Sequence, residues 1–352
     1  MTASADPGRQ GLMERLEAGP VLCAEGYLFE LERRGYLQAG PFVPEVVLEH
    51  PEQVTAMHRD FVHAGSDVVE ALTYYAHREK LRVVGKDDLL ESINRQALTI
   101  ARDVANEAGA LLAGNVCNSN VYDPANPGTH TQTRGMFEEQ VAWAAEEGVD
   151  FVIGETFRFA EEARIALDVI RRADLPAVIT LAVGQTPKTR EGWSLADACR
   201  RLADEGADVV GLNCIRGPAT MLPLLPEVVA AVDVPVAALP VPYRTVPDQP
   251  TFQSLRDHDT APVPNGRPFP TALDPFTCTR YEVAQFTVAA QAAGVRYFGL
   301  CCGAAPHHVR SMAEALGRTP QASRYSDDMS RHAFFGTAPG LATHNREYRE
   351  QL

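Results

Sequence analysis

The feature that most restricts the fold of this chain is a regular alternation of short apolar runs with longer segments of helical periodicity. The runs are rich in Val, Ile, Leu and Ala, a pattern typical of parallel strands that are buried on both faces. Strands are predicted at 20–24, 66–72, 110–115, 150–155, 177–182, 208–213, 234–239 and 297–301. Helices are predicted between them at 51–64, 89–107, 136–147, 160–172, 195–205, 220–232, 280–293 and 306–316.

This alternation of strands with helices predicts an α/β fold, the (β/α)8 TIM barrel. The alternative is a doubly wound open sheet, which would normally carry a phosphate-binding loop after its first strand. Residues 25–29 match neither a dinucleotide-binding motif nor a P-loop. We expect residues 1–317 to form the barrel and residues 318–352 to form a C-terminal arm with an oligomer contact. The long loop 240–276 after strand seven is expected to cover the site or to form an interface.

Charge and apolar pattern limit the partners of the chain. The net charge is −14 and there is no run of basic residues, which argues against nucleic acid or an anionic membrane as a partner. No stretch approaches the ~18 consecutive apolar residues that span a bilayer, and the first residues lack the apolar core of a signal peptide. We therefore expect a cytoplasmic protein. Its 7 cysteines, irregularly spaced, are expected to stay reduced in that compartment.

Three of the cysteines are expected at the same end of the barrel, where TIM-barrel active sites lie. Cys214 follows predicted strand six, and Cys301 and Cys302 end strand eight. Neighbouring strand residues point to opposite faces, so both can face one site only if the strand ends there, and Gly303 permits such a turn. Packing as a small hydrophobic residue is the alternative role for a buried cysteine. Three thiolates with an open fourth position favour a catalytic Zn²⁺ site.

The segments that carry these cysteines, 211–214 and 299–303, resemble the zinc signature of the homocysteine S-methyltransferase family. The likeness extends to its betaine–homocysteine methyltransferase branch at Phe29–Tyr36, Ala39–Glu45, Glu49–Glu52, Tyr75–Leu81 and Gly294–Tyr297. The resemblance implies zinc bound by the three cysteines, homocysteine as the methyl acceptor and an onium compound as the methyl donor. It also implies a homo-oligomer, a dimer or tetramer, built partly through the C-terminal arm.

The resemblance further implies a subsite for the amino group of homocysteine. A carboxylate of the family after strand four is matched here by Glu155. The family has Asp-Gly-Gly after strand one, where this chain has Ala24, Glu25 and Gly26. Glu25 is therefore expected to replace the missing aspartate from the next position. Gly26 and Asn213 complete the predicted homocysteine site.

The methyl donor must carry its activated methyl on a cationic nitrogen or sulfur, and aromatic faces bind such cations at roughly 0.5–2 kcal/mol per contact. Tyr75 matches the tyrosine that the branch has after strand two, and Tyr74, Phe42 and Phe157 are predicted beside it. Core packing is the alternative role for these last three. The branch has tryptophan at the position of Phe42 and tyrosine at that of Thr156, so the donor pocket is altered.

The predicted function is zinc-dependent transfer of a methyl group from a betaine-like onium donor to homocysteine, giving methionine. A free thiol titrates near about 8.5, and zinc coordination supplies the thiolate without a general base. His344 in the arm is expected to meet the carboxylate of the donor across a subunit boundary. Two alternatives remain: a sulfonium donor such as S-methylmethionine or dimethylsulfoniopropionate, and a barrel that binds zinc and thiol without turnover.

Overall fold

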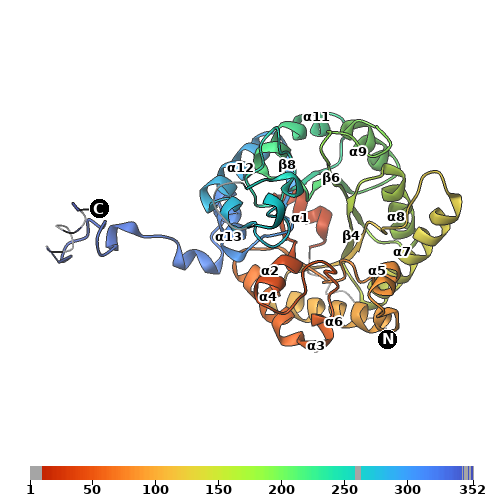
Figure 1. Cartoon of the computed structure of the whole chain (residues 1–352), viewed down its shortest axis with the longest axis horizontal. Helices are drawn as coiled ribbons and strands as arrows, with labels where there is room; N and C mark the ends of the chain where they lie inside the picture. Colours follow the sequence, from red (N-terminus) through yellow and green to blue (C-terminus); the bar gives the residue numbers. More distant parts are fainter. Residues whose placement is uncertain (1–9, 258–262, 343, 345–347, 349, 352) are drawn as a thin grey trace.

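The chain folds around a closed barrel of parallel strands in the order β1 to β8, so the TIM-barrel prediction is confirmed (Figure 1). The computed structural model describes residues 10–257, 263–342, 344, 348 and 350–351. The strands are β1 Val21–Ala24, β2 Val68–Glu70, β3 Leu111–Cys117, β4 Phe151–Phe157, β5 Ala177–Leu181, β6 Val209–Asn213, β7 Val236–Leu239 and β8 Val295–Leu300. Pairing of β1 with β8 closes the ring.

All helices but the first surround the barrel on its outer side; the first, α1, lies in the middle of the ring (Figure 1), and its Leu12 and Leu16 pack in the apolar cluster inside the barrel. The helices are α1 Leu12–Ala18, α2 Tyr27–Arg33, α3 Val46–Glu49, α4 Pro51–His63, α5 Arg78–Val83, α6 Leu90–Ala108, α7 Pro127–Glu147, α8 Ala160–Arg172, α9 Leu195–Asp204, α10 Pro218–Met221, α11 Leu225–Val229, α12 Arg280–Ala292 and α13 Pro306–Ala315. The continuous helix predicted at 220–232 is wrong, because a 3-10 turn at Leu222–Leu224 separates α10 from α11. Pro223 and Pro226 lack the N–H that a regular helix needs there.

Alternate residues of each strand face opposite sides of the barrel wall. Val21, Cys23, Val68 and Tyr297 belong to an apolar cluster inside the barrel, whereas the residues between them pack with the surrounding helices. At the carboxyl end of the strands the inward positions become polar: Glu25, Glu70, Asn115 and Glu155. The interior therefore changes from a dry core to a polar layer where the barrel opens.

The loop after β7 packs onto this polar end. Tyr243, Phe252 and Leu273 from the loop are buried in the same cluster as Cys214 and Cys301. The loop therefore covers the thiols from one side. Beyond α13, the C-terminal segment of the chain extends away from the barrel (Figure 1).

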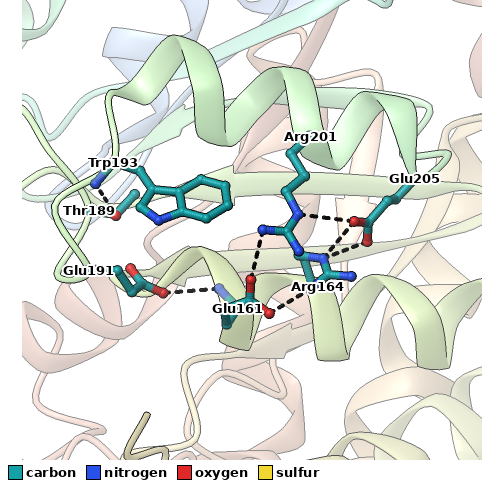
Figure 2. Close-up of polar contacts among 7 residues, drawn as sticks. All are labelled: Glu161, Arg164, Thr189, Glu191, Trp193, Arg201 and Glu205. Atoms are coloured by element: carbon teal, nitrogen blue, oxygen red, sulfur yellow. Dashed lines mark hydrogen bonds and ion pairs between the residues drawn. The ribbon is translucent and has the colours of Figure 1, made fainter.

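A network of ion pairs joins α8 to α9 on the outside of the barrel, and we call it the α8–α9 network (Figure 2). Arg164 contacts Glu161 and Glu205, each at 2.6 Å. Arg201 contacts the same two glutamates at 3.0 and 3.2 Å. The guanidinium of Arg201 also lies over the Trp193 ring, 4.7 Å from its centre. Every charge in this network faces an opposite charge.

In the part of the chain that the structure describes, no helix combines the length and apolar character needed to cross a bilayer.

Candidate active site

Three thiols meet at the open end of the barrel. The Sγ of Cys214 lies 3.7 Å from that of Cys302, which lies 3.9 Å from the Sγ of Cys301. All three sulfurs lie within 4.8 Å of one another. Thiolates at about 2.3 Å from a tetrahedral zinc ion are separated by about 3.8 Å. The spacing of the sulfurs therefore fits three corners of a zinc site and leaves a fourth corner for another ligand.

The backbone explains how sequential cysteines reach one site. Strand β8 ends at Leu300, one residue before the predicted end, so Cys301 and Cys302 are both free of the strand alternation. Gly303 follows with φ of +95°, a conformation that favours glycine. Cys214 itself has φ of +54° directly after β6, and such strain in a residue other than glycine is concentrated at functional sites.

Gly26 allows the first turn after β1 to approach the thiols. Its φ is +79°, and a Cβ atom at this position would lie 2.3 Å from the carbonyl oxygen of Cys301. No side chain fits in that space, so glycine is required for the contact between this turn and the Cys301–Cys302 segment. Gly26 thus brings the turn after β1 against the backbone of Cys301 and Cys302.

The thiols influence one another's protonation. Hydrogen bonds from Cys301 and Cys302 hold the pKa of Cys214 well below its usual range. The same contacts with Cys214, together with burial, raise the pKa values of Cys301 and Cys302. Cysteine sulfurs are soft donors, which suit zinc rather than magnesium or calcium.

Three buried glutamates, Glu25, Glu70 and Glu155, lie beside the sulfurs, and we call them the carboxylate cluster. An oxygen of Glu25 lies within 4.8 Å of Glu155 and of the Cys301 sulfur, and one also lies within 4.8 Å of Glu70. No exposed fraction in the cluster exceeds 3%. No ion pair to these carboxylates is found among the residues that the structure describes. Buried carboxylates without a cation are costly, so the cluster is suited to a cationic ligand.

Amide side chains hold two members of the cluster. Asn115 donates through Nδ2 to Glu70 at 2.6 Å and to Glu155 at 2.7 Å. Asn213 donates to the other oxygen of Glu155 at 2.7 Å and accepts the backbone N–H of Thr156 at 3.0 Å. Both oxygens of Glu25 are buried without a hydrogen-bond partner.

Burial and mutual repulsion shift the protonation of the cluster. Burial, followed by the charges of Glu155 and Glu70, raises the pKa of Glu25 well above its usual range. Burial and the Glu155 charge raise that of Glu70. Burial and the Cys214 thiolate raise the pKa of Glu155 to about 7. A cation bound among them would oppose all these shifts, because it stabilises the ionised carboxylates.

A cavity of about 20 Å³ connects Glu70 and Glu155 with Cys301 and Cys302. Its polar and sulfur-bearing lining residues are Tyr27, Glu70, Tyr74, Asn115, Glu155, Cys301 and Cys302. A cavity of this volume holds about one water-sized group. The cavity therefore brings a small polar group within reach of the sulfurs.

Three of the predicted donor aromatics lie at the end of the barrel that holds the thiols. Phe42 packs against the apolar cluster that contains Cys214 and Cys301, as Cys302 does. Tyr75 is half-buried next to Tyr74, with ring centres 4.5 Å apart. One face of Tyr75 is already covered by Lys80, whose Nζ lies 4.3 Å from the ring centre. Tyr74 lines the cavity beside the carboxylates, and thus lies on the acceptor side of the site.

The other two predicted donor residues lie elsewhere. Phe157 is fully buried and packs edge-on against Phe137 of α7, with ring centres 5.9 Å apart. This placement argues against Phe157 as a donor residue, because its ring is occupied by core packing outside the barrel wall. His344 is exposed in the C-terminal segment, which extends away from the barrel of its own chain (Figure 1).

Sequence reasoning missed Glu70 and Lys80. Glu70 could have been found, because it is the last inward position of a short apolar strand and a charged residue there is unusual. Lys80 gave no such signal, because its position over Tyr75 depends on the turn between β2 and α5.

Known proteins resemble this chain in sequence and in fold. The family model described as homocysteine S-methyltransferase matches residues 26–316. Betaine–homocysteine S-methyltransferase 1 of Xenopus laevis is 36% identical over 97% of this chain and 83% of that protein. S-methylmethionine–homocysteine S-methyltransferase of Pongo abelii is 31% identical over 100% of this chain and 95% of its own length. In fold, the chain is similar to the metallated form of the homocysteine methyltransferase MmuM from Escherichia coli, with a TM-score of 0.66, 18% identity, and coverage of 84% of this chain and 96% of that one.

Proposed function

Because the chain belongs to the homocysteine S-methyltransferase family, we propose that it transfers a methyl group from a betaine-like onium donor to homocysteine in a zinc-dependent reaction that gives methionine. The observation that carries the proposal is the meeting of three cysteine sulfurs, 3.7 and 3.9 Å apart, beside buried carboxylates that lack a cation. One half of the site suits a metal and a thiol, and the other half suits an ammonium group.

Cys214, Cys301 and Cys302 are the proposed zinc ligands. Bound zinc supplies a nucleophilic sulfur at neutral pH, because a thiol coordinated to it loses its proton. The anionic cysteines around it keep that sulfur electron-rich. The metallated form of the Escherichia coli homocysteine methyltransferase supports a metal in this fold.

The carboxylate cluster is proposed to orient homocysteine. Glu155 and Glu25 would bind its ammonium group, with Asn213 holding Glu155 in place at 2.7 Å. Gly26 lets the turn after β1 approach the substrate and the Cys301 carbonyl. Fixing the acceptor at both ends directs its sulfur toward the incoming methyl group, and such orientation supplies a large part of the rate.

The donor is proposed to bind on the side of Tyr75 and Phe42, with Tyr74 between donor and acceptor. Aromatic faces attract the onium group, and the apolar cluster around Phe42 excludes water from the transferring methyl. Lys80 adds a positive charge beside Tyr75 that suits the carboxylate of a zwitterionic donor such as a betaine. Among the residues that the structure describes, Lys80 forms no ion pair with a carboxylate.

A second donor class is favoured by one specific comparison. The Pongo abelii relative, named for S-methylmethionine, matches this chain over its whole length. Phe42 and Thr156 also depart from the betaine branch in the donor pocket. S-methylmethionine or another sulfonium compound, such as dimethylsulfoniopropionate, is therefore the second candidate donor for the same acceptor.

Assembly and location belong to the same proposal. We infer a homo-oligomer, a dimer or tetramer, in which residues 318–352 form an arm outside the 1–317 barrel and bring His344 to the donor of another subunit. The exposed Tyr325, Met329 and Phe335 of this segment support a contact there. The proposed partners are small molecules rather than nucleic acid or membrane, and the proposed location is the cytoplasm.

The test is methionine production from homocysteine by zinc-loaded protein, measured by mass spectrometry across a panel of donors. The panel contains glycine betaine, proline betaine, S-methylmethionine and dimethylsulfoniopropionate. We expect turnover with a betaine, and turnover with the sulfonium donors alone would select the second candidate. Absence of methionine with every donor would contradict both.

A further inference from the structure

The proposed reaction gives roles to Glu25 and Glu155 but leaves Glu70, the third member of the carboxylate cluster, without one. Glu70 lies on β2 and is 3% exposed. In the described part of the chain, the hydrogen bond found for its side chain comes from Asn115 at 2.6 Å. A buried carboxylate with a single neutral donor is destabilising for the protein alone. Its presence therefore calls for a ligand.

Asn115 links Glu70 to the site. Its Nδ2 carries two hydrogens, and these point to Glu70 at 2.6 Å and to Glu155 at 2.7 Å. The opposite orientation of the amide would set its oxygen against two carboxylate oxygens, so the present orientation is strongly favoured. Oδ1 of Asn115 is consequently left buried without a partner, as are both oxygens of Glu25.

The carboxylates of Glu70 and Glu155, the unpartnered oxygen of Asn115 and the cavity match one chemical group. Glu70, Asn115 and Glu155 line the same 20 Å³ cavity as Cys301 and Cys302. A primary ammonium is about the size of the one water that such a cavity holds. It also carries three hydrogen-bond donors and a positive charge. A water or hydroxyl would fit the space but would leave the carboxylate charge unmatched.

We propose that Glu70 and Asn115 together select acceptor thiols that carry a primary ammonium group. Glu70 contributes negative charge to the cavity that receives the ammonium group. Asn115 holds the carboxylates of Glu70 and Glu155 in position relative to each other. This inference rests on the proposed function, because it concerns the acceptor of the same reaction. It adds that the selectivity is set from β2 and β3 as well as from β4.

The test compares two acceptors that differ only in the ammonium group. Homocysteine and 4-sulfanylbutanoate have the same thiol, chain length and carboxylate. We expect the wild-type ratio of their kcat/KM values to favour homocysteine and to fall about tenfold or more in Glu70→Gln, mainly through a higher KM for homocysteine. A charge-assisted hydrogen bond lost to a neutral amide accounts for a change of this order. Turnover of 4-sulfanylbutanoate should stay within about twofold.

The ratio separates selection from damage. A variant that folds poorly or loses metal turns over both acceptors less well and leaves their ratio unchanged. Asn115→Ala removes the hydrogen bonds to Glu70 and Glu155 and should also lower the ratio of the two kcat/KM values. This variant tests the inference if Glu70→Gln does not fold. The matched control is Glu162→Gln: Glu162 is also 3% exposed and accepts from Ser119 at 2.6 Å, outside the cavity. It should leave the ratio at the wild-type value.

Each outcome bears on the inference. An unchanged ratio in both Glu70→Gln and Asn115→Ala, with an active wild type, would overturn the role of Glu70 and leave the proposed function standing. A wild type that turns over both thiols equally would also overturn the selection. A wild type that methylates neither thiol would contradict the proposed function, and the inference would fall with it.

Discussion

Two charged regions of this molecule are built in opposite ways. In the α8–α9 network, Arg164 and Arg201 alternate with Glu161 and Glu205 at 2.6 to 3.2 Å, and the side chains remain about one-third exposed (Figure 2). In the carboxylate cluster, the glutamates are at most 3% exposed and have only neutral amide and hydroxyl donors, or no donor at all. The first region is complete within the protein, whereas the second is complete only with a ligand.

The difference shows which charges serve stability and which serve function. Exposed pairs cost little to form and contribute about 0.2–1 kcal/mol each. Buried like charges destabilise the fold, and proteins retain such groups mainly where a ligand or a reaction needs them. The network therefore holds two helices together, and we assign chemistry to the cluster and the thiols beside it.

The largest expected effect comes from removing one of the three sulfurs beside the carboxylate cluster. Cys302→Ser should lose most of its bound zinc and lower methyl transfer by about a thousandfold or more, because two thiolates no longer define the site. Zinc content by plasma mass spectrometry and methionine formation measure the two losses. Cys199→Ala, at a buried cysteine of α9, is the control and should keep both. Full zinc content in Cys302→Ser would contradict the assignment of metal chemistry to the thiols beside the carboxylate cluster.

The next effect concerns the unmatched charge itself. Glu155→Gln keeps the shape of the side chain but removes its charge, and kcat/KM for homocysteine should fall about 10- to 100-fold through the lost ammonium contact. Steady-state kinetics with homocysteine varied at saturating donor measure it. An equal loss in Glu162→Gln would show that a buried glutamate anywhere in the fold has this effect.

Opposite pH dependence is expected from the two regions. Burial would raise the pKa of Glu205, but hydrogen bonds from Arg164 and Arg201 outweigh it and bring the pKa below the ordinary 4.5. The stability from Glu205 is thus present above pH 4.5 and is lost as the pH falls through its lower folded value. Burial and the Glu155 charge raise the pKa of Glu70 above 4.5. Its contribution is present below pH 4.5 and is lost as the pH rises toward its folded value.

Melting temperatures of the ligand-free protein across pH measure this contrast. Glu205→Gln should flatten the acid side of the profile, and Glu70→Gln should flatten the decline on the side of rising pH. The same slope change in both variants would mean that the two regions do not differ in protonation. Homocysteine should also reduce the decline in the wild type, because its ammonium stabilises the ionised cluster.

The smallest effect on activity and stability is expected from a substitution in the α8–α9 network. Arg201→Ala removes two ion pairs and the contact with Trp193, yet should lower stability by only about 1 kcal/mol. It should leave kcat/KM for both substrates unchanged. Thermal unfolding and steady-state kinetics measure the two quantities. A loss of activity comparable to that of Glu155→Gln would erase the functional distinction between the regions.

The barrel and its thiols could be predicted from the sequence because both depend on strand periodicity. Alternating apolar runs located the strands, and the ends of β6 and β8 then located Cys214 and Cys301. The break in the helix predicted at 220–232 could also have been read from its prolines.

The hydrogen bonds of the site could not be predicted in the same way. The link from Asn115 to Glu70 and Glu155 depends on the stagger between β2, β3 and β4, which is fixed only when the barrel closes. Phe157 illustrates the same limit, because its side of the wall depends on an irregularity in the pairing of β4 with β5. Periodicity gives the side of a regular strand, but not that of a residue next to a bulge.

Zinc K-edge X-ray absorption on the wild-type protein, with and without homocysteine, tests the proposed zinc site most directly, because it counts the sulfur neighbours of the metal. We predict three sulfur neighbours at about 2.3 Å in the free protein and four once homocysteine is added. Fewer than three sulfurs in the free protein, or a sulfur count that homocysteine leaves unchanged, would contradict a zinc site built from Cys214, Cys301 and Cys302 with a place for the substrate thiol.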